Sequence, residues 1–483
     1  MTLEIFEQEL SNPDVILKLK TSVIGDDIQI TTPFGKKPLV YADYTASGRA
    51  LTQVEDFVME HVLPFYANSH TESSYCGAYT TNLREEARQV IAQQTNAGEE
   101  CTVIFSGSGA TSGVNRLVSL CCVASQEKKP VVFIGPFEHH SNILPWRESG
   151  AEVVEIGEDE ICGIDLGALE KELKMRADGR LMIGAFSAAS NVTGILTDVD
   201  AVSKLLKQYN ALSFWDYAGG APYLDVDMNP GEGLEKDAVF LSPHKFLGGP
   251  GASGLLIIRN SIIKNQRPTW PGGGSVSYVS PWGHDYLKSV SEREEAGTPN
   301  IVGDIRAALV FMVKSAVGQD YIDARVRQLV DQALTVWNKN PAINVLAGNR
   351  FNRLPVFSFV FSDVDGKPYH HQLATLLLSD LTGIQARGGC ACAGPYGHRL
   401  LGVERVQSEH IRSEISDGRE IEKPGWVRLN LSYLFSEQKV DYIIDEINKF
   451  PQNLEKYSRG YLGDMSTAKF SLCKQTAAGS PQT

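Results

Sequence analysis

Ala238-Val-Phe-Leu-Ser-Pro-His-Lys245 is the segment most informative about the type of fold, and glycines at 248, 249 and 251 follow it. Its first four residues form a short apolar run, which is typical of a strand buried on both faces of a sheet. Lys245 is therefore expected just past the end of a strand, where small residues let other groups approach its amine. A lysine that carries a cofactor as a Schiff base needs a depressed pKa and an aldehyde nearby. A solvated surface lysine is the alternative reading of this motif on its own.

Similar apolar runs alternate with longer helical patterns from about residue 38 to residue 300. These runs are Thr102–Phe105, Val131–Ile134, Leu181–Phe186, Leu212–Trp215 and Gly254–Ile258. Continuous apolar strands separated by helices predict a mostly parallel sheet with helices on both faces, which is an α/β fold. In such sheets the chemistry lies past the carboxyl ends of the strands. Functional residues are therefore expected directly after these runs.

An aspartate, Asp216, follows one of these runs. A carboxylate buried at a strand end is costly unless a cation pairs with it. The protonated ring nitrogen of pyridoxal phosphate (PLP) is such a cation, and PLP acts as an electron sink in that form. An aspartate that caps the next helix is the alternative.

The loop Ser106-Gly-Ser-Gly-Ala-Thr111 lies between a predicted strand and a predicted helix through 115–119. Small residues and a hydroxyl at a helix N-terminus suit a phosphate group, which the backbone amides and the helix dipole attract. The loop lacks the further glycine of a dinucleotide fingerprint, so it is a weak signal by itself.

The segment Glu138-His-His-Ser-Asn142 follows another predicted strand. A histidine at this point can stack on a planar ring. A helix-capping cluster and a metal site are the alternatives, and metal is the less favoured because no third ligand has suitable sequence context.

In this order, the motifs resemble those of the class V aminotransferase-fold PLP enzymes, and most closely the cysteine desulfurase and molybdenum-cofactor sulfurase branch. The resemblance covers about residues 38 to 455. It also includes Tyr41–Asp43, Ser190–Gly194, Glu295–Asn300, Arg387–Pro395 and Arg428. It implies the PLP-dependent transferase fold of type I, with a large domain around a mostly parallel sheet and a smaller α+β C-terminal domain.

The resemblance also implies a role for each matching residue. Lys245 would carry the cofactor and move the α-proton, Asp216 would pair with the ring nitrogen, and His139 would stack on the ring. The remaining cofactor contacts would come from Ala110, Thr111, Asn191, Ser242, His244 and Thr298. Substrate-binding residues would be Asn191, Arg387 and Arg428, the last holding the carboxylate as a bidentate pair. Because Thr298 would reach the phosphate of a neighbouring subunit, the resemblance implies a homodimer with shared active sites.

The segment Arg387-Gly-Gly-Cys-Ala-Cys392 aligns with the loop that carries the nucleophilic cysteine of desulfurases, and Cys392 falls on that position. Cations such as Arg387 or His398 would favour the reactive thiolate. If the loop is extended, Cys390 and Cys392 share a face, so both thiols could point into the site. Similar loops without sulfur chemistry, and a cysteine pair that binds metal or forms a redox bridge, are the alternatives.

The activity implied is the removal of sulfur from L-cysteine, which leaves a persulfide on Cys392 and releases alanine. A separate acceptor protein would then take the sulfur, because the chain ends before the additional C-terminal domain expected of a full cofactor sulfurase. The alternatives are a class V aminotransferase, a PLP-dependent lyase or epimerase acting on another small amino acid, and a non-catalytic scaffold, against which the intact Lys245 and Asp216 argue.

One departure from the family pattern concerns the residues after the ring-nitrogen aspartate. Desulfurases commonly read Asp-Gly-Ala-Gln or a His variant there, whereas this chain reads Asp216-Tyr-Ala-Gly219. The family's side-chain contact to the PLP oxygen is then missing or comes from elsewhere.

The chain divides into four predicted segments. Residues 1–37 would pack on the small domain, residues 38–300 would form the large PLP-binding domain, and residues 301–460 would form the small domain with a bridging helix over 301–337. A strand is expected over 356–361, a helix over 371–382 and a strand over 426–431. Residues 461–483 are expected to be disordered because of their polar composition.

The 483 residues carry a net charge of −13, and the pI is near 5.3. An acidic surface repels phosphate backbones and anionic lipids, which disfavours nucleic acid and membrane partners. No apolar run approaches the ~20 residues of a membrane span. The acidic N-terminus resembles neither a secretory signal nor a transit peptide, so the expected location is the cytoplasm.

Overall fold

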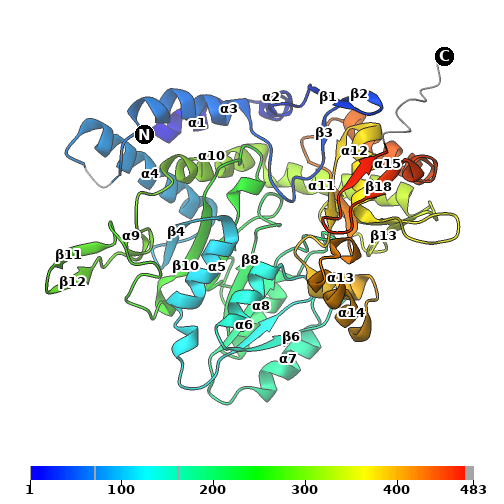
Figure 1. The fold of residues 1–483 in the computed structure, drawn as a ribbon. Coiled ribbons are helices and arrows are strands. Elements are labelled where there is room, and N and C mark those ends of the chain that lie inside the picture. Colours follow the sequence, from blue (N-terminus) through cyan, green and yellow to red (C-terminus); the bar gives the residue numbers. More distant parts are fainter. Residues whose placement is uncertain (1, 70–71, 160–162, 474–483) are drawn as a thin grey trace. The chain divides into compact units, whose positions relative to one another are not determined.

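The computed structural model describes residues 2–69, 72–159 and 163–473 (Figure 1). The chain forms two compact units. The first contains Met1–Ile24, Ser47–Ser190 and Leu196–Asp323, and the second contains Gly25–Ala46, Asn191–Ile195 and Ala324–Thr483.

A seven-stranded sheet forms the centre of the first unit. Its strands, in spatial order, are β4 (Cys101–Gly107), β10 (Gly254–Arg259), β9 (Ala238–Leu241), β8 (Leu212–Asp216), β7 (Met182–Ser187), β5 (Val131–Ile134) and β6 (Glu152–Glu155). Only β10 pairs antiparallel with its neighbours, whereas the pairs from β9 to β6 are parallel. Every residue of β5, β7 and β9 is buried, which explains their continuous apolar sequences. The prediction of a mostly parallel α/β sheet is confirmed.

Helices pack on this sheet and on one another. Helix α5 (Gly109–Leu120) contacts β4, β9 and β10, and its buried Val114 and Leu117 join Phe214 and Phe240 of the strands in one apolar core (Figure 1). Helix α10 (Ile301–Val317) packs on α4 (Tyr75–Gln94). The other elements of this unit include α1 (Thr2–Leu10), α2 (Val15–Thr21), α3 (Thr52–Phe57), α6 (Leu144–Glu148), α7 (Leu166–Met175), α8 (Val199–Gln208), α9 (Val290–Glu294) and the hairpin of β11 (Val276–Ser280) and β12 (Gly283–Tyr286).

The second unit is α+β. Its four-stranded antiparallel sheet has the order β13 (Ile343–Val345), β14 (Val356–Phe361), β17 (Trp426–Asn430) and β16 (Arg387–Gly389). Two short strands, β3 (Val40–Tyr41) and β15 (Ile384–Gln385), pair in parallel beside it. Further elements include β1 (Gln29–Thr32), β2 (Gly35–Pro38), α12 (His371–Thr382), α13 (Gly394–Leu400), α14 (Arg405–Ser416) and α15 (Glu437–Tyr457).

The two units divide the chain differently from the predicted segments. Residues 1–24 group with the first unit rather than with the small domain, and residues 301–323 do so as well. The predicted bridging helix is two helices, α10 and α11 (Gln319–Trp337), because Gly318 between them has a φ of +83° that ends α10.

The predicted disordered tail contains ordered structure. Strands β18 (Tyr461–Gly463) and β19 (Phe470–Leu472) form an antiparallel hairpin. The rest of that prediction, residues 474–483, lies outside the described residues. Among the helices that the structure describes, none combines the length and the apolar character of a membrane span.

Candidate active site

Lys245 lies directly after β9, as the last residue of a short 3₁₀ turn over Pro243–Lys245. The backbone at Gly48 passes close to this turn, and the amide of Gly48 donates a 2.8 Å hydrogen bond to the carbonyl of His244. A Cβ atom on Gly48 would lie only 1.7 Å from the carbonyl oxygen of Phe246, so only glycine fits there. Burial, together with the positive charge of Lys245, lowers the pKa of His244 to about 4. His244 is therefore neutral near pH 7.

Asp216 is the last residue of β8, the strand next to β9. Its side chain is buried, and its Oδ1 accepts a 2.7 Å hydrogen bond from the amide of Ala218. Burial raises the pKa of Asp216, whereas the Ala218 amide and the charge of Lys245 lower it. A buried carboxylate of this kind gains from a cationic partner, so the protonated ring nitrogen of PLP fits it. The Ala218 bond belongs to a turn, and no helix that Asp216 could cap begins in this described stretch.

Helix α5 begins at the predicted phosphate loop. The amide of Ala110 donates a 2.9 Å hydrogen bond to Oγ of Ser242, and the hydroxyls of Thr111 and Ser141 are 2.7 Å apart. Gly109 has a φ of +61°, and a Cβ atom there would approach Ser242 Oγ to 2.9 Å. Amides and hydroxyls at a helix N-terminus fit a phosphate group. The structure thus brings together three of the residues predicted to hold the phosphate.

His139 precedes the 3₁₀ turn over His140–Asn142, and its Nδ1 accepts a 3.1 Å hydrogen bond from the amide of Ser141. The capping alternative is therefore observed, and the bond fixes the orientation of the imidazole. Stacking of this ring on a cofactor stays a prediction.

Glu138, beside His139, has a structural role that the sequence analysis missed. Its carboxylate is buried and accepts hydrogen bonds from the amide of Ser187 (2.9 Å), the hydroxyl of Ser187 (2.6 Å) and the side-chain amide of Asn142 (2.6 Å). Ser187 is the partner of Asp216 in the β7–β8 pairing, so Glu138 anchors the strand end next to Asp216. Burial raises the pKa of Glu138 to about 7.

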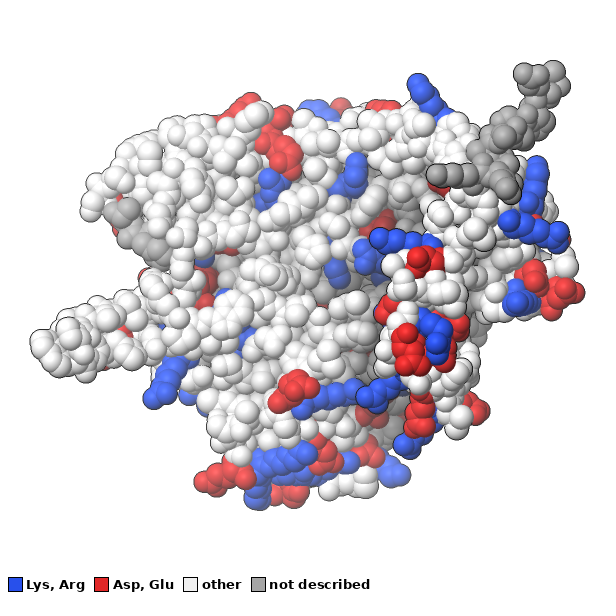
Figure 2. All heavy atoms as spheres, viewed as in Figure 1, with Lys and Arg blue, Asp and Glu red and all other residues white. Residues whose placement is uncertain are grey.

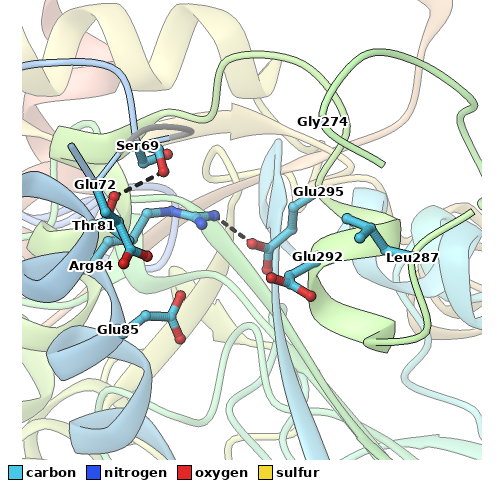
Figure 3. Close-up of a pocket in the computed structure, with 9 residues that line it drawn as sticks. All are labelled: Ser69, Glu72, Thr81, Arg84, Glu85, Gly274, Leu287, Glu292 and Glu295. Atoms are coloured by element: carbon cyan, nitrogen blue, oxygen red, sulfur yellow. Dashed lines mark hydrogen bonds and ion pairs between the residues drawn. The ribbon is translucent and has the colours of Figure 1, made fainter. Parts of the chain in front are cut away.

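Thr298 is exposed, in a loop that Glu295 anchors. The Glu295 carboxylate accepts hydrogen bonds from Arg84, Arg88 and the amide of Phe105. Figure 3 shows Arg84 pointing toward Glu295 in a pocket of about 380 Å³. The pocket is also lined by acidic side chains, Glu72, Glu85 and Glu292. Nothing in this arrangement tests the predicted contact of Thr298 with a phosphate.

Arg428, Asn191 and Arg387 lie together in the second unit. Arg428 is buried on β17 and donates from Nη1 to the carbonyl of Asn191 (3.0 Å) and from Nη2 to Asp43 (2.9 Å). Arg387 stands directly opposite Arg428 on β16 and donates from Nε to Asp43 (3.0 Å). Burial lowers the pKa of Arg428, and Asp43 acts against this shift.

Two polar atoms of this group lack partners. Nε of Arg428 and Oδ1 of Asn191 are buried and have no hydrogen-bond partner among the described residues. Unpartnered buried polar atoms are costly and are typical of places where a ligand completes the bonding. A donor and an acceptor in one cluster suit an amino-acid substrate.

The loop that carries Cys390 and Cys392 does not meet the condition under which both thiols would share a face. Ala393 donates a 3.0 Å hydrogen bond to the carbonyl of Cys390, and Ala391 and Cys392 have φ values of +51° and +56°. This segment is a tight turn with two left-handed residues, so the loop is not extended and the premise for two thiols on one face is wrong. The left-handed conformation costs roughly 1–2 kcal/mol for each non-glycine residue. Cys392 is exposed, whereas Cys390 lines a cavity of about 560 Å³ with Trp426 and Ile411.

Known proteins resemble this chain over most of its length. Residues 40–441 match the aminotransferase class-V family. A probable cysteine desulfurase from Vibrio cholerae is 30% identical over 362 residues, which are 74% of this chain and 85% of that protein. A probable cysteine desulfurase from Pyrococcus abyssi is 29% identical over 78% of this chain and 90% of its own length.

Solved structures share the fold. The cysteine desulfurase from Thermococcus onnurineus superposes with a TM-score of 0.70 at 24% identity, covering 86% of this chain and 95% of its own. The cysteine desulfurase CsdA from Escherichia coli has the same TM-score at 21% identity, covering 91% of this chain and 98% of its own. At these identities the likeness concerns the fold alone.

Proposed function

Because this chain belongs to the aminotransferase class-V family, whose members are PLP-dependent, we propose that it is a cysteine desulfurase. It takes sulfur from L-cysteine, keeps it as a persulfide on Cys392 and releases alanine. The relatives named probable cysteine desulfurases support this reading.

One observation carries the proposal. Cys392 is exposed in a turn. The carbonyl of Ala391, directly before it, accepts a hydrogen bond from the side-chain amide of Asn191. The backbone carbonyl of Asn191 accepts a hydrogen bond from Arg428. Burial lowers the pKa of Arg428, and Cys392 is, with Asp43, among the groups whose charge acts against this shift. A thiol and a buried guanidinium with an unpartnered Nε therefore lie within electrostatic reach of each other. An amino-acid carboxylate bound by Arg428 would present its side chain near this thiol.

In the proposed reaction, PLP supplies the electron sink that makes the α-proton of the substrate acidic. Asp216 would hold the ring nitrogen protonated, and the start of α5 with Ser242 would hold the phosphate. The amine of Lys245 takes the α-proton. The Cys392 thiolate then attacks the substrate sulfur, so a sulfur–sulfur bond forms as the Cβ–S bond breaks. Lys245 returns a proton, and the balance is cysteine plus thiol giving alanine plus persulfide.

A homodimer is part of the proposal. Thr298 is exposed, and the nearby β11–β12 hairpin carries Tyr278, Val279 and Trp282 at its surface, the last 91% exposed. The backbone of Gly297, next to Thr298, is bonded to Gly273 just before this hairpin. Figure 2 shows almost no charged atoms on the projecting hairpin. Asp285, opposite Tyr278, is the charged residue of the two strands. Exposed apolar side chains with so few charges around them favour a protein partner, and a second copy would bring Thr298 to its neighbour's phosphate.

A separate acceptor protein for the sulfur and a cytoplasmic location complete the proposal. A persulfide on an exposed cysteine is accessible to an attacking thiol of such a protein.

The direct test is to incubate the purified holoenzyme and a dithiol reductant with L-cysteine, L-alanine, L-serine and L-aspartate in separate reactions. Equal amounts of sulfide and alanine from cysteine alone are expected. Formation of a keto acid without sulfide would replace this function by that of an aminotransferase.

A further inference from the structure

Two arginines share one carboxylate in the second unit. Arg387 and Arg428 are directly opposite each other in the antiparallel pairing of β16 and β17. Side chains at opposed positions point to the same face, and like charges there repel. Asp43 lies between them, with Oδ2 accepting from Arg387 Nε at 3.0 Å and Oδ1 accepting from Arg428 Nη2 at 2.9 Å.

The backbone fixes Asp43 in this position. Its neighbour Ala42 donates to the carbonyl of Gln385 at 3.0 Å and accepts from the amide of Asn430 at 2.8 Å. Tyr41 and Gln385 are partners in the parallel pairing of β3 and β15. Asp43 lies two residues after Tyr41, and Arg387 lies two residues after Gln385. Ala42 thus bonds to both β15 and the end of β17, which places Asp43 beside both arginines.

The charges in this cluster do not cancel. Two guanidinium groups face one carboxylate, which leaves a single positive charge. The Arg428 guanidinium is buried with Nε unpartnered, whereas 51% of the Arg387 side chain is exposed. One substrate carboxylate would neutralise the remaining charge, and a second anionic group would meet Asp43 without a cation to pair with it.

We propose that Asp43 is a specificity-determining residue, which reduces the charge of the carboxylate site to one and so selects amino acids whose side chains are uncharged. The inference rests on the proposed function, because it takes Arg428 and Arg387 as the groups that receive the substrate carboxylate. Asp43 acts through the two arginines, so it is a positioning residue and takes no part in the chemistry.

L-asparagine and L-aspartate are suitable probes, because they have nearly the same shape and differ by one negative charge. Their dissociation constants can be measured by titrating the holoenzyme and following the absorbance of the cofactor. This measurement needs no sulfur transfer. Wild-type protein should bind asparagine about tenfold more tightly than aspartate or better. In Asp43→Asn the site carries two positive charges, and the preference should vanish or reverse.

Two further variants separate charge from structure. Asp43→Glu keeps the charge and should keep the preference for asparagine. The double variant Asp43→Asn with Arg387→Gln restores a single positive charge, so it should regain that preference even though both contacts are lost. A purely structural role of Asp43 would weaken the binding of both probes equally in Asp43→Asn, and the double variant would not recover.

The outcomes distinguish this inference from the proposed function. If Asp43→Asn leaves the ratio of the two dissociation constants unchanged while the wild type still forms alanine from cysteine, the role of Asp43 is refuted and the desulfurase function stands. If the wild type forms no alanine, the function fails, whatever the ratio shows. Should Asp43→Asn fail to fold, Arg387→Gln alone must lower the affinity for aspartate more than that for asparagine, and an equal loss would contradict the proposal.

Discussion

The side-chain amide of Asn191 donates a 2.7 Å hydrogen bond to the carbonyl of Ala391, the residue directly before Cys392. The backbone carbonyl of the same asparagine accepts from Arg428. Asn191 therefore links the guanidinium predicted to bind the substrate to the turn that carries the thiol. The two left-handed residues of that turn need such an external contact, because their conformation is unfavourable by itself.

Replacing this asparagine should uncouple substrate binding from sulfur transfer. In Asn191→Ala the turn loses its side-chain contact and Cys392 samples other positions, so the rate of alanine formation should fall about tenfold or more. The affinity for cysteine should fall less than this rate, because the variant loses the Oδ1 acceptor of Asn191 but keeps Arg428 and Asp43. Rapid-quench measurement of alanine in a single turnover checks this prediction. Asn338→Ala is a matched control, since Asn338 makes a similar 2.7 Å bond to the carbonyl of Gly348. Equal rates in the two variants would show that the contact between Asn191 and Ala391 does not support sulfur transfer.

Lys245 should be the residue that carries the cofactor. Lys245→Ala should abolish turnover and remove the link between cofactor and protein that borohydride makes permanent. The exposed Lys204 on α8 provides a control, and Lys204→Ala should keep both properties. Mass spectrometry of the reduced protein locates the link. A cofactor attached to another lysine in the wild type would show the assignment to be wrong.

The buried Glu138 should make stability depend on pH. Its pKa in the folded protein is about 7, against an ordinary value of 4.5. The folded state therefore holds a proton that the unfolded state has released between these values, and the stability gained from it is lost as pH rises through about 7. The full effect is on the order of 3 kcal/mol.

The side chain of Gln in Glu138→Gln cannot ionise, so this variant should not lose stability in this way as pH rises. Denaturant titration at about pH 5 and about pH 8 measures the free energy of unfolding of both proteins. The free energy of unfolding of the wild type should fall relative to that of the variant as pH rises. A difference between the two proteins that does not change with pH would mean that Glu138 titrates normally.

The exposed Trp282 should contribute to a dimer. Trp282→Ser should weaken self-association without lowering thermal stability at low protein concentration, because the side chain makes few contacts within its own subunit. Met175→Ser on α7 removes another exposed apolar side chain and serves as the control. Sedimentation velocity over a range of concentrations reports the association. A monomeric wild type with full activity would contradict the shared-site dimer.

The strands and their chemistry could be predicted from the sequence because burial on both faces leaves a continuous apolar run. β9, β14 and α12 begin and end at the predicted residues. Asp216 and Lys245 follow neighbouring strands, so their proximity follows from a general property of parallel sheets.

Other features depend on contacts between distant residues or on unusual backbone geometry. The pairing of Asp43 with Arg387 joins positions 344 residues apart, and no local pattern indicates it. The left-handed turn at Ala391 and Cys392 contains no glycine, which is the usual signal for that conformation. The hairpin of β18 and β19 lies in a segment of polar composition, which led to the incorrect expectation of disorder there.

Cys392, and not Cys390, should receive the sulfur from the substrate. After a single turnover with L-cysteine, the protein is alkylated to protect persulfides, digested with trypsin and analysed by mass spectrometry. Both cysteines lie between Arg387 and Arg399 in one tryptic peptide, so fragment ions that break the chain between them are needed to locate the added sulfur. One extra sulfur is expected on Cys392 in the wild type and in Cys390→Ala, and none in Cys392→Ala. An extra sulfur on Cys390 alone, or alanine formation with no persulfide on either residue, would contradict this expectation.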